Sequence, residues 1–267
     1  MKLGRKVNSL ASDIQKILIF SDIQFPYLDK PSDEALNELI VDWQPDIAVL
    51  NGDGIDFPTI SHFEKDNRMS RFSDDVLGYK EYLQKKNRLL PKKARKHYNA
   101  GNHEDRLRKY MNEKASELVG LEELEIPNVL GIRDMGWGYT PYYDPMSEAS
   151  APGLDLGGLL VTHGYNVSKH SGQSARASFE KFGGSGVMGH THRLGAYYHT
   201  NYRGNYVWLE AGCLCVLNPF YTVSPDWQNG IVAGYIVPKE DDKPARFDIR
   251  QVPIVHGKMM FEGKRYG

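Results

Sequence analysis

The feature that most constrains the fold is an alternation of short strand-like runs with longer amphipathic segments in the first half of the chain. Three runs rich in apolar or β-branched residues predict strands, and three longer segments with apolar residues at helical spacing predict helices. In chain order they are 16–20, 32–43, 47–50, 73–90, about 97–100 and 105–118. Strands that alternate with helices pair in parallel through right-handed crossovers. The sequence therefore predicts an α/β fold built on a parallel sheet.

The second half of the chain begins in the same way and then becomes mainly β. The predicted elements are a strand at 159–162, a helix at 172–182, a strand at 187–188 and further strands at 197–200, 205–210, 230–237 and 245–254. Turn-forming Gly, Asn, Pro and Asp separate the later strands. Segment 139–157 is rich in Tyr, Pro, Ser and Gly and predicts a loop or insertion. We expect residues 1–267 to form one domain, in which the β-rich part 193–267 completes a second sheet.

Composition excludes several classes of protein. Of 267 residues, 40% are hydrophobic and 25% are charged, as in ordinary soluble domains. Because 33 Lys and Arg oppose 34 Asp and Glu, bulk charge gives no reason to expect binding to nucleic acid or to anionic membranes. The first fifteen residues lack the apolar core of a secretory signal, and the apolar runs are too short to span a bilayer. We expect a cytoplasmic protein with no membrane partner.

The two cysteines, Cys213 and Cys215, are separated by a single residue. So close a pair is not the pattern of a structural disulfide or of a zinc knuckle. Free thiols fit a reducing cytosol. We expect the pair to pack in a buried strand.

Polar residues of metal-ligand type follow the predicted strands at their carboxyl ends. They are Asp22, Gln24, Asp53, Asp56, Asn102, His103, His163, His190 and His192. Loops after neighbouring strands of an α/β sheet converge at one edge. Two carboxylates, an amide oxygen and three imidazoles brought together there supply enough donors for two cations with a carboxylate between them. Any one of these residues alone would more often be a cap or a satisfied core residue, so the prediction depends on the joint order.

In this order the motifs resemble the calcineurin-like metallophosphoesterase superfamily. The matching segments are Ser21-Asp22-Ile23-Gln24, Gly52-Asp53-Gly54-Ile55-Asp56, Gly101-Asn102-His103-Glu104, Thr162-His163-Gly164 and Gly189-His190-Thr191-His192. The chain is also similar to phage-encoded or prophage-encoded phosphoesterases. The resemblance implies a four-layer α/β/β/α sandwich, in which two packed mixed sheets are flanked by helices. It implies that Asp53 bridges two metals, that Asp22 and His192 hold the first, and that Asn102, His163 and His190 hold the second.

The first motif departs from the family pattern at Gln24, where a histidine is usual. A neutral amide oxygen suits Mn²⁺ or Mg²⁺ better than Zn²⁺, and it should bind the first metal more weakly than an imidazole. Two alternatives stay open: Gln24 ligates the metal directly, or it acts through water or not at all. We expect two divalent cations, with Mn²⁺ as the expected metal and Mg²⁺, iron, Zn²⁺, Ni²⁺ and Co²⁺ as alternatives.

The mechanism follows from the metals that the resemblance implies. Two cations about 3.5–4 Å apart lower the pKa of a bridging water and neutralise charge on a phosphoryl group, so the expected nucleophile is a metal-bound hydroxide. His103 is the expected acid for the leaving oxygen. Asp56 is its expected partner. A simple loop cap is the alternative for Asp56, and Glu104 is the alternative partner for His103.

The sequence constrains the identity of the ester substrate less than it constrains the type of reaction. Phe57 stands where the Ser/Thr protein phosphatases of the superfamily carry an arginine that grips phosphate, which disfavours that activity. Arg106, Lys169 and His170 are the expected substrate contacts, although the last two also fit a solvated loop. We expect a metal-dependent phosphodiesterase acting on DNA, RNA or nucleotides. The alternatives are a phosphomonoesterase, either a small-molecule or a protein phosphatase, and a non-catalytic metal-binding scaffold.

Overall fold

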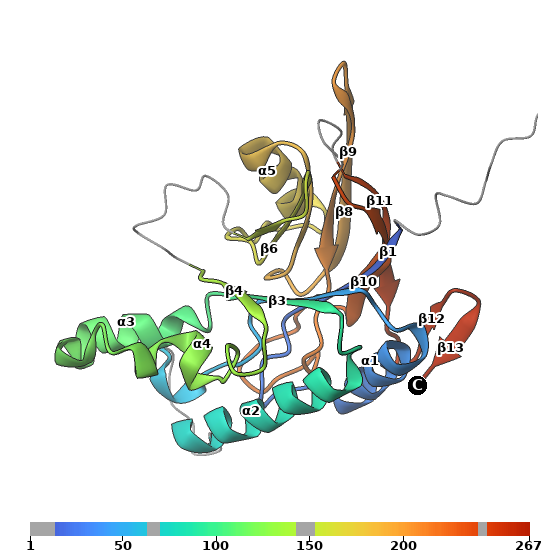
Figure 1. Cartoon of the computed structure of the whole chain (residues 1–267). Helices are drawn as coiled ribbons and strands as arrows, with labels where there is room; N and C mark the ends of the chain where they lie inside the picture. The colour runs from blue at the N-terminus through green and yellow to red at the C-terminus, as the bar shows by residue number, and fades with distance from the viewer. Residues whose placement is uncertain (1–13, 63–69, 143–152, 240–244) are drawn as a thin grey trace, which may run out of the picture.

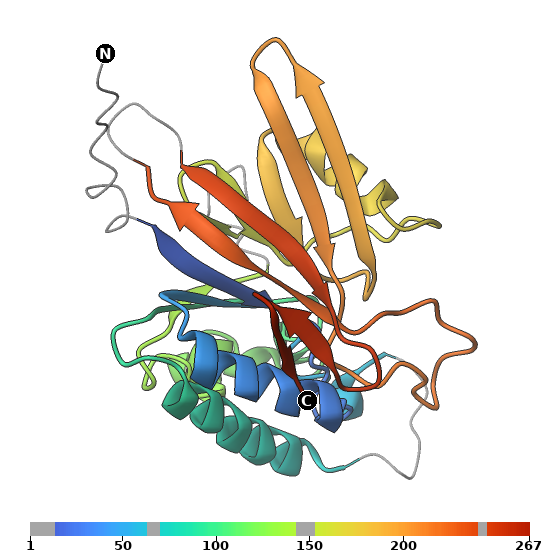
Figure 2. The same cartoon turned by 90° about the vertical axis from the view of Figure 1, so that its right-hand side faces the viewer.

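Two mixed β-sheets pack face to face, and helices cover both outer sides (Figures 1 and 2). The computed structural model describes residues 14–62, 70–142, 153–239 and 245–267. The layers follow the order helix, sheet, sheet, helix. The predicted four-layer fold class is therefore confirmed.

The first sheet has the strand order β11-β10-β1-β2-β3-β4. Its parallel part contains β1 (Gln15–Phe20), β2 (Ile47–Asn51), β3 (Arg95–Asn99) and β4 (Gly138–Thr140). Its antiparallel part contains β10 (Gly230–Val237) and β11 (Arg246–Pro253). The prediction that the end of the chain completes the second sheet is wrong for these two strands. Because β1 is apolar on both faces it must be interior, and the largely buried β10 supplies the partner for its second edge.

The second sheet has the order β5-β6-β7-β9-β8. Its strands are β5 (Leu154–Asp155), β6 (Leu159–Thr162), β7 (Ser185–Met188), β9 (Gly204–Ala211) and β8 (Leu194–Asn201). Strands β6, β7 and β9 are parallel, and β8 and β9 form an antiparallel hairpin. The carboxyl ends of β6 and β7 lie on the same side of the molecule as those of the parallel strands of the first sheet.

Strand β1 shows how the core is divided between the layers. Ile17 and Ile19 point to the layer between the two sheets, whereas Leu18 and Phe20 point to the layer under the helices. This alternation is the two-residue period of a strand. A strand covered on both faces is therefore apolar at consecutive positions, as β1 is from Ile17 to Phe20.

Helices cover the outer faces of both sheets. The first sheet is covered by α1 (Lys30–Trp43) and α2 (Phe72–Leu89), and the second by α5 (Gln173–Phe182). The remaining helical segments are α3 (Asp105–Lys114), α4 (Ile126–Val129), η1 (Pro58–Ile60), η2 (Ser116–Leu118) and η3 (Glu122–Leu124). Among the helices described, none combines the length and apolarity needed to cross a membrane.

Several short elements differ from the sequence prediction. The helix expected over 105–118 ends at Lys114. The expected loop 139–157 begins within β4 and contains β5, while 143–152 lies outside the described residues. A terminal hairpin of β12 (Met259–Phe261) and β13 (Lys264–Tyr266) was not predicted. It packs on α1, where the rings of Phe261 and Trp43 lie 4.9 Å apart.

His97 on β3 should make the free energy of unfolding depend on pH in the acid range. Its Nε2 lies 2.8 Å from Oγ1 of Thr140, and burial, together with the charge of Arg95, lowers the pKa of His97 from 6.5 to about 4. The unfolded chain therefore takes up this proton first as the pH falls, so the stability contributed by neutral His97 is complete above pH 6.5 and is lost toward pH 4. We expect the free energy of unfolding to fall over this range, and to fall less steeply in His97→Gln. Urea titrations at a series of pH values test this, and equal slopes would contradict it.

Candidate metal centre

The predicted ligands converge where the carboxyl ends of strands from both sheets meet. Asp22, Asp53 and Asn102 follow β1, β2 and β3 of the first sheet, and His163, His190 and His192 follow β6 and β7 of the second. The sandwich thus brings together loops from distant parts of the chain. This is the placement that the order of the motifs predicts.

Two groups of donors each lie close enough together to hold a cation. The first contains Asp22, Asp53 and His192, whose ligand atoms all lie within 4.8 Å of one another. Within it, Oδ1 of Asp22 lies 3.1 Å from Nε2 of His192. All three side chains are buried. This group corresponds to the predicted first metal.

The second group contains Asp53, His163 and His190, again within 4.8 Å of one another. Nε2 of His163 lies 3.3 Å from Oδ2 of Asp53 and 3.2 Å from Oδ1 of Asn102. Asp53 belongs to both groups, as expected of a bridging ligand. The structure thus brings the predicted ligands together in the predicted division, and their binding of metal stays a prediction.

The electrostatics of the centre favour positive charge. Burial acts to lower the pKa of His163, but the carboxylate of Asp53 outweighs it and raises the pKa of His163 to about 10. In the same way Asp22 outweighs burial and raises the pKa of His192 to about 9. The two buried carboxylates thus draw protons onto His163 and His192, whereas burial and the charge of His163 lower the pKa of His190 to about 4. Divalent cations meet the same need, so the donor set fits the predicted pair of metals.

The loops hold most of these ligands in an unusual backbone conformation. Five of the seven predicted ligands have φ between 50° and 69°: Asp22, Gln24, Asp53, His190 and His192. Such values are strained for residues other than glycine and persist only where the surroundings impose them. Here the backbone N–H of Gln24 donates to the carbonyl of Asp53 at 2.9 Å, and that of Leu214 donates to the carbonyl of Asp22 at 3.1 Å. Hydrogen bonds between the loops therefore hold the strained geometry.

Glu104 anchors the loop that carries Asp53. Its wholly buried carboxylate accepts hydrogen bonds from the backbone N–H groups of Asp53 at 3.0 Å, Gly54 at 2.8 Å and Gly101 at 2.7 Å. The hydroxyl of Tyr98 donates to it at 2.6 Å. The alternative role for Glu104, as the partner of His103, is therefore not what the structure shows. Both of its oxygens are engaged by the loops that hold the ligands.

Two further supports escaped the sequence analysis. The backbone carbonyl of Asn51 lies 2.8 Å from Nδ1 of His163 and so leaves Nε2 to face the second donor group. The buried carboxylate of Glu210 accepts from Oγ1 of Thr191, which lies between His190 and His192, at 3.0 Å. A backbone carbonyl can belong to any type of residue, so the sequence does not reveal this acceptor. Glu210 lies inside a strand, away from every motif. A glutamate directly after the apolar run 207–209 was the available signal.

Gln24 lies at the first donor group. Its Nε2 is 3.2 Å from Oδ2 of Asp53 and 3.4 Å from Nε2 of His192. Among the described residues its buried Oε1 has no hydrogen-bond partner. A half-turn of the amide exchanges the two atoms and turns Oε1 toward the donor group. The position therefore fits an oxygen ligand to the first metal, either directly or through water.

We expect Gln24→His to tighten binding at the first site, because imidazole is a stronger donor than a neutral amide oxygen. Calorimetric titration with Mn²⁺ and Zn²⁺ measures the affinity of each site. The exposed Gln44, at the end of α1, provides the control Gln44→His, which adds an imidazole elsewhere. Affinity that is unchanged from the parent protein would argue against direct ligation by residue 24.

The predicted catalytic pair is assembled beside Asp53. Nδ1 of His103 lies 2.5 Å from Oδ1 of Asp56, and Nε2 of His103 lies 3.6 Å from Oδ2 of Asp53. Arg106 on α3 joins them: its Nη1 donates to Oδ1 of Asp56 at 2.7 Å, and its Nη2 lies 3.1 Å from Nε2 of His103. An acid, its orienting carboxylate and a guanidinium are thus grouped at one end of the donor set.

The other expected substrate contacts lie in a different setting. Lys169 and His170 are exposed on the loop before α5, and among the described residues neither makes a hydrogen bond or ion pair with a side chain of the centre. Their role stays a prediction.

Phe57 is buried and stacks on Phe72, with ring centroids 5.1 Å apart. A charged arginine could not occupy that apolar position without loss of stability.

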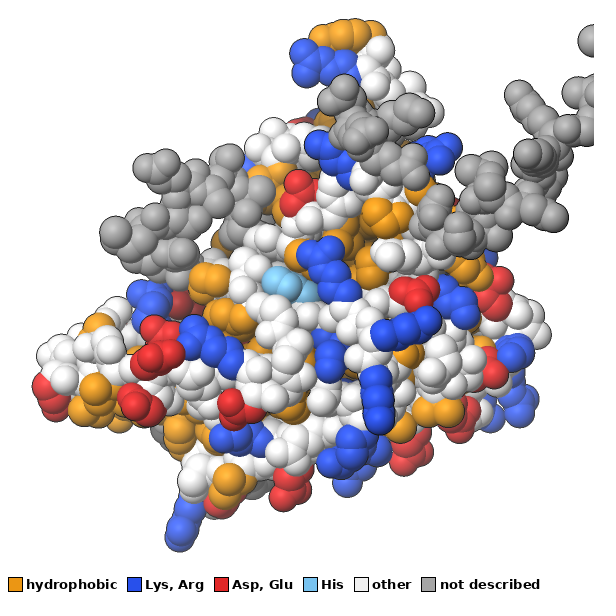
Figure 3. All heavy atoms as spheres, viewed as in Figure 1, with side chains coloured by type: hydrophobic (Ala, Val, Ile, Leu, Met, Phe, Trp, Pro, Cys, Tyr) orange, Lys and Arg blue, Asp and Glu red, His pale blue; other side chains and the backbone are white. Residues whose placement is uncertain are grey.

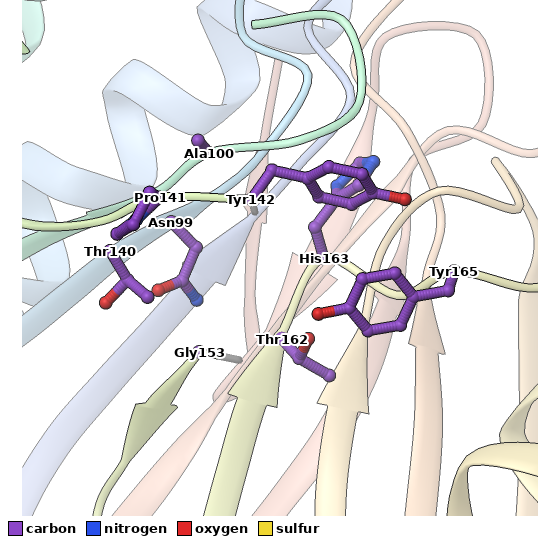
Figure 4. Close-up of a pocket in the computed structure, with 9 residues that line it drawn as sticks. All are labelled: Asn99, Ala100, Thr140, Pro141, Tyr142, Gly153, Thr162, His163 and Tyr165. Atoms are coloured by element: carbon purple, nitrogen blue, oxygen red, sulfur yellow. The ribbon is translucent and has the colours of Figure 1, made fainter. Parts of the chain in front are cut away.

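A small pocket adjoins the second donor group (Figure 4). Its lining residues are Asn99, Ala100, Thr140, Pro141, Tyr142, Gly153, Thr162, His163 and Tyr165. The ring of Tyr142 lies 6.0 Å from that of His163 and 5.2 Å from that of Tyr165. Two tyrosines therefore lie side by side next to a predicted metal ligand.

Comparisons with known proteins identify phage proteins that match the chain over almost its full length. No family model matches the chain. The gene 54 protein of Mycobacterium phage L5 is 30% identical and that of phage D29 is 29% identical, over 94% and 93% of this chain and 98% and 97% of theirs.

Solved structures similar to the chain include a vacuolar protein sorting 29 from Cryptosporidium parvum (TM-score 0.40, 14% identity, 89% of this chain and 97% of that one). They also include a metallophosphoesterase from Sphaerobacter thermophilus (TM-score 0.39, 17% identity, 88% of each chain). The sequence identity to the phage L5 protein extends over almost the full length of both chains. This chain therefore belongs to the family of the mycobacteriophage gene 54 proteins.

Proposed function

We propose that this protein is a metal-dependent phosphodiesterase that acts on nucleic acid or nucleotides. The observation that carries the proposal is the position of Asp53, which belongs to both donor groups and has Nε2 of His103 3.6 Å from its Oδ2. A shared carboxylate is the hallmark of a two-metal hydrolase, and an imidazole at its edge can deliver a proton.

Two bound divalent cations would activate water and neutralise charge on the phosphoryl group. The chain's own residues supply the rest. Asp56 accepts a hydrogen bond from Nδ1 of His103 and so turns Nε2 toward the substrate. The doubly protonated ring of His103 can pass its Nε2 proton to the leaving oxygen and return to the neutral form that keeps the Nδ1 proton. The guanidinium of Arg106, 3.1 Å from the same nitrogen, lies where it can stabilise negative charge on that oxygen.

The small amount of positive charge grouped with the catalytic pair favours a diester over a monoester. A phosphomonoester carries about one negative charge more than a diester at neutral pH. In the described residues Arg106 is the cation grouped with His103, and Asp56 already balances its charge. Elsewhere, cationic and anionic side chains are interspersed over the described part of the face in Figure 3, so no broad cationic surface is seen there. A phosphodiester carries a single negative charge, so it matches this small amount of positive charge best.

Aromatic side chains beside the centre support a substrate that carries bases. Tyr27 follows Gln24 in the same loop, and its ring lies 5.9 Å from that of Phe220 and 5.3 Å from that of Tyr221. Phe220 and Tyr221 are 42% and 45% exposed. The backbone N–H of Tyr27 donates to the carbonyl of Gln24 at 2.7 Å, so this aromatic group adjoins the loop that carries Gln24. Exposed aromatic rings are the usual platform for stacking of bases.

Hydrolysis of bis-p-nitrophenyl phosphate and p-nitrophenyl phosphate tests the activity. The protein is stripped of metal and resupplied with Mn²⁺, Mg²⁺, Zn²⁺, Ni²⁺ or Co²⁺. We expect a preference for the diester, and we expect His103→Ala to keep its metal content while turnover falls roughly 10²–10⁴-fold. Full activity in this variant would remove His103 from the mechanism. No turnover with any metal would favour the non-catalytic scaffold, and a preference for the monoester would favour a phosphomonoesterase.

A further inference from the structure

The two thiols of Cys213 and Cys215 point to the same side of their segment. Both residues are buried and form isolated β-bridges, Cys213 with Asn229 and Cys215 with Leu28. The backbone bends at Leu214 between them, and the two sulfur atoms lie within 4.8 Å of each other. The side chain of Leu214 packs in the apolar layer under the first sheet. The single-residue spacing therefore presents a pair of sulfur atoms together.

The thiol pair lies behind His192. Sγ of Cys215 is 3.7 Å from Nδ1 of His192, while Nε2 of the same ring faces Asp22 at 3.1 Å. Both sulfur atoms and a ring nitrogen of His192 lie within 4.8 Å of one another. One ring nitrogen of His192 thus faces the predicted first metal site, and the other faces two free thiols.

The separation of Cys215 from His192 matches that of two neighbouring ligands in a tetrahedral cation site. With zinc–sulfur and zinc–nitrogen bonds of about 2.3 and 2.0 Å, neighbouring nitrogen and sulfur ligands lie roughly 3.5 Å apart, and two sulfur ligands roughly 3.8 Å apart. The distance from Cys215 to His192 is 3.7 Å. In contrast, Nδ1 of His163 meets a backbone oxygen at 2.8 Å, the usual partner of a metal-bound histidine. His192 differs from it in facing sulfur.

We propose that Cys213, Cys215 and Nδ1 of His192 form a third cation site, for a thiophilic divalent ion such as Zn²⁺ or Cd²⁺. Two thiolates select such an ion over Mn²⁺ or Mg²⁺, which the oxygen-rich centre in front of His192 suits better. Binding releases the two thiol protons and the Nδ1 proton to solvent. Nδ2 of Asn229 lies 3.7 Å from Sγ of Cys213 and donates toward the sulfur, which stabilises a thiolate.

Sharing of His192 couples the new site to the predicted first metal. An ion at the thiols fixes the ring with Nδ1 turned toward sulfur, and Nε2 then stays aimed at Asp22. The same ion also withdraws electron density from the ring. Occupancy of the thiol site therefore changes the affinity of the first site for its own cation, whatever reaction the centre performs.

Titration of the reduced full-length protein with Cd²⁺ tests the site through ultraviolet absorption by cadmium–thiolate bonds. The chain has only two cysteines, so this absorption reports on them alone. We expect one equivalent of Cd²⁺ to produce it in the parent protein and in Asp53→Asn, in which the shared ligand of the other two sites is altered. Cys213→Ser and Cys215→Ser should each lose at least half of the absorption.

His192→Gln tests the third ligand, and we expect it to weaken Cd²⁺ binding at the thiols at least about tenfold. Unchanged affinity in this variant would show a simple dithiol chelate and overturn the shared site. Absence of thiolate absorption in the parent protein at saturating Cd²⁺ would overturn the proposal without reference to any variant. In that case the contact at 3.7 Å is a weak hydrogen bond between packed side chains.

Discussion

Asp53→Asn should lower the affinity for both cations of the candidate centre by at least about 100-fold, because loss of even an indirect support of a metal ligand costs 10–100-fold. The two donor groups share this carboxylate, so one substitution removes negative charge from both. Metal content after dialysis and calorimetric titration with Mn²⁺ measure the loss. Turnover, where present, should fall with the metal.

The asparagine variant isolates the charge of Asp53 from its structural role. Oδ1 of Asp53 accepts a hydrogen bond from the backbone N–H of His103 at 2.9 Å, and an amide oxygen can accept the same bond. The exposed Asp155 on β5 supplies the matched control, Asp155→Asn, for which we expect parent-like binding. If Asp53→Asn still bound one cation with the affinity of the parent protein, Asp53 would not be shared between two metals.

Glu104→Gln should lower the free energy of unfolding by about 3 kcal/mol, because charge-assisted hydrogen bonds are lost and buried N–H groups are left without an acceptor. The parent carboxylate accepts from three or more backbone donors and from Tyr98. The amide nitrogen of glutamine cannot accept, so it would face N–H groups that have no other partner. Urea denaturation followed by circular dichroism measures the change.

The same variant should also bind metal more weakly, since the loop that Glu104 holds carries Asp53. The exposed Glu123 provides the control Glu123→Gln, for which we expect a change within about 0.5 kcal/mol. Parent-like stability in Glu104→Gln would show that the loops around Asp53 hold their shape without this carboxylate.

The parallel core could be predicted from sequence because local pattern determines it. The runs around Ile17 and Val49 are apolar at every position, and this is typical of strands covered on both faces. Polar residues directly after them mark the sheet edge where ligands gather. The convergence of Asp22, Asp53 and His163 therefore follows from strand order, and the structure brings them together.

The remaining features depend on contacts that are distant in sequence. Nothing local distinguishes a strand that joins β1 from one that joins β9, so β10 and β11 were assigned to the wrong sheet. Edge strand β4 has three residues, too few for a periodic pattern. Glu104 was found as a motif residue, but its role depends on backbone donors from another loop. The spacing of Cys213 and Cys215 predicts only buried packing, because His192 is brought near them only by the fold.

The pairing of β1 with β10 has a consequence for how the protein is made. A fragment ending at residue 192 would contain every predicted ligand, and yet β1 would lack its antiparallel neighbour and expose the backbone of an apolar strand. Unpaired apolar edges of this kind recruit strands from other molecules. During synthesis the ribosome must therefore deliver residues 230–237 before the first sheet closes. The ligand-bearing segment is in this sense not an independent folding unit, and shorter versions of the chain should aggregate.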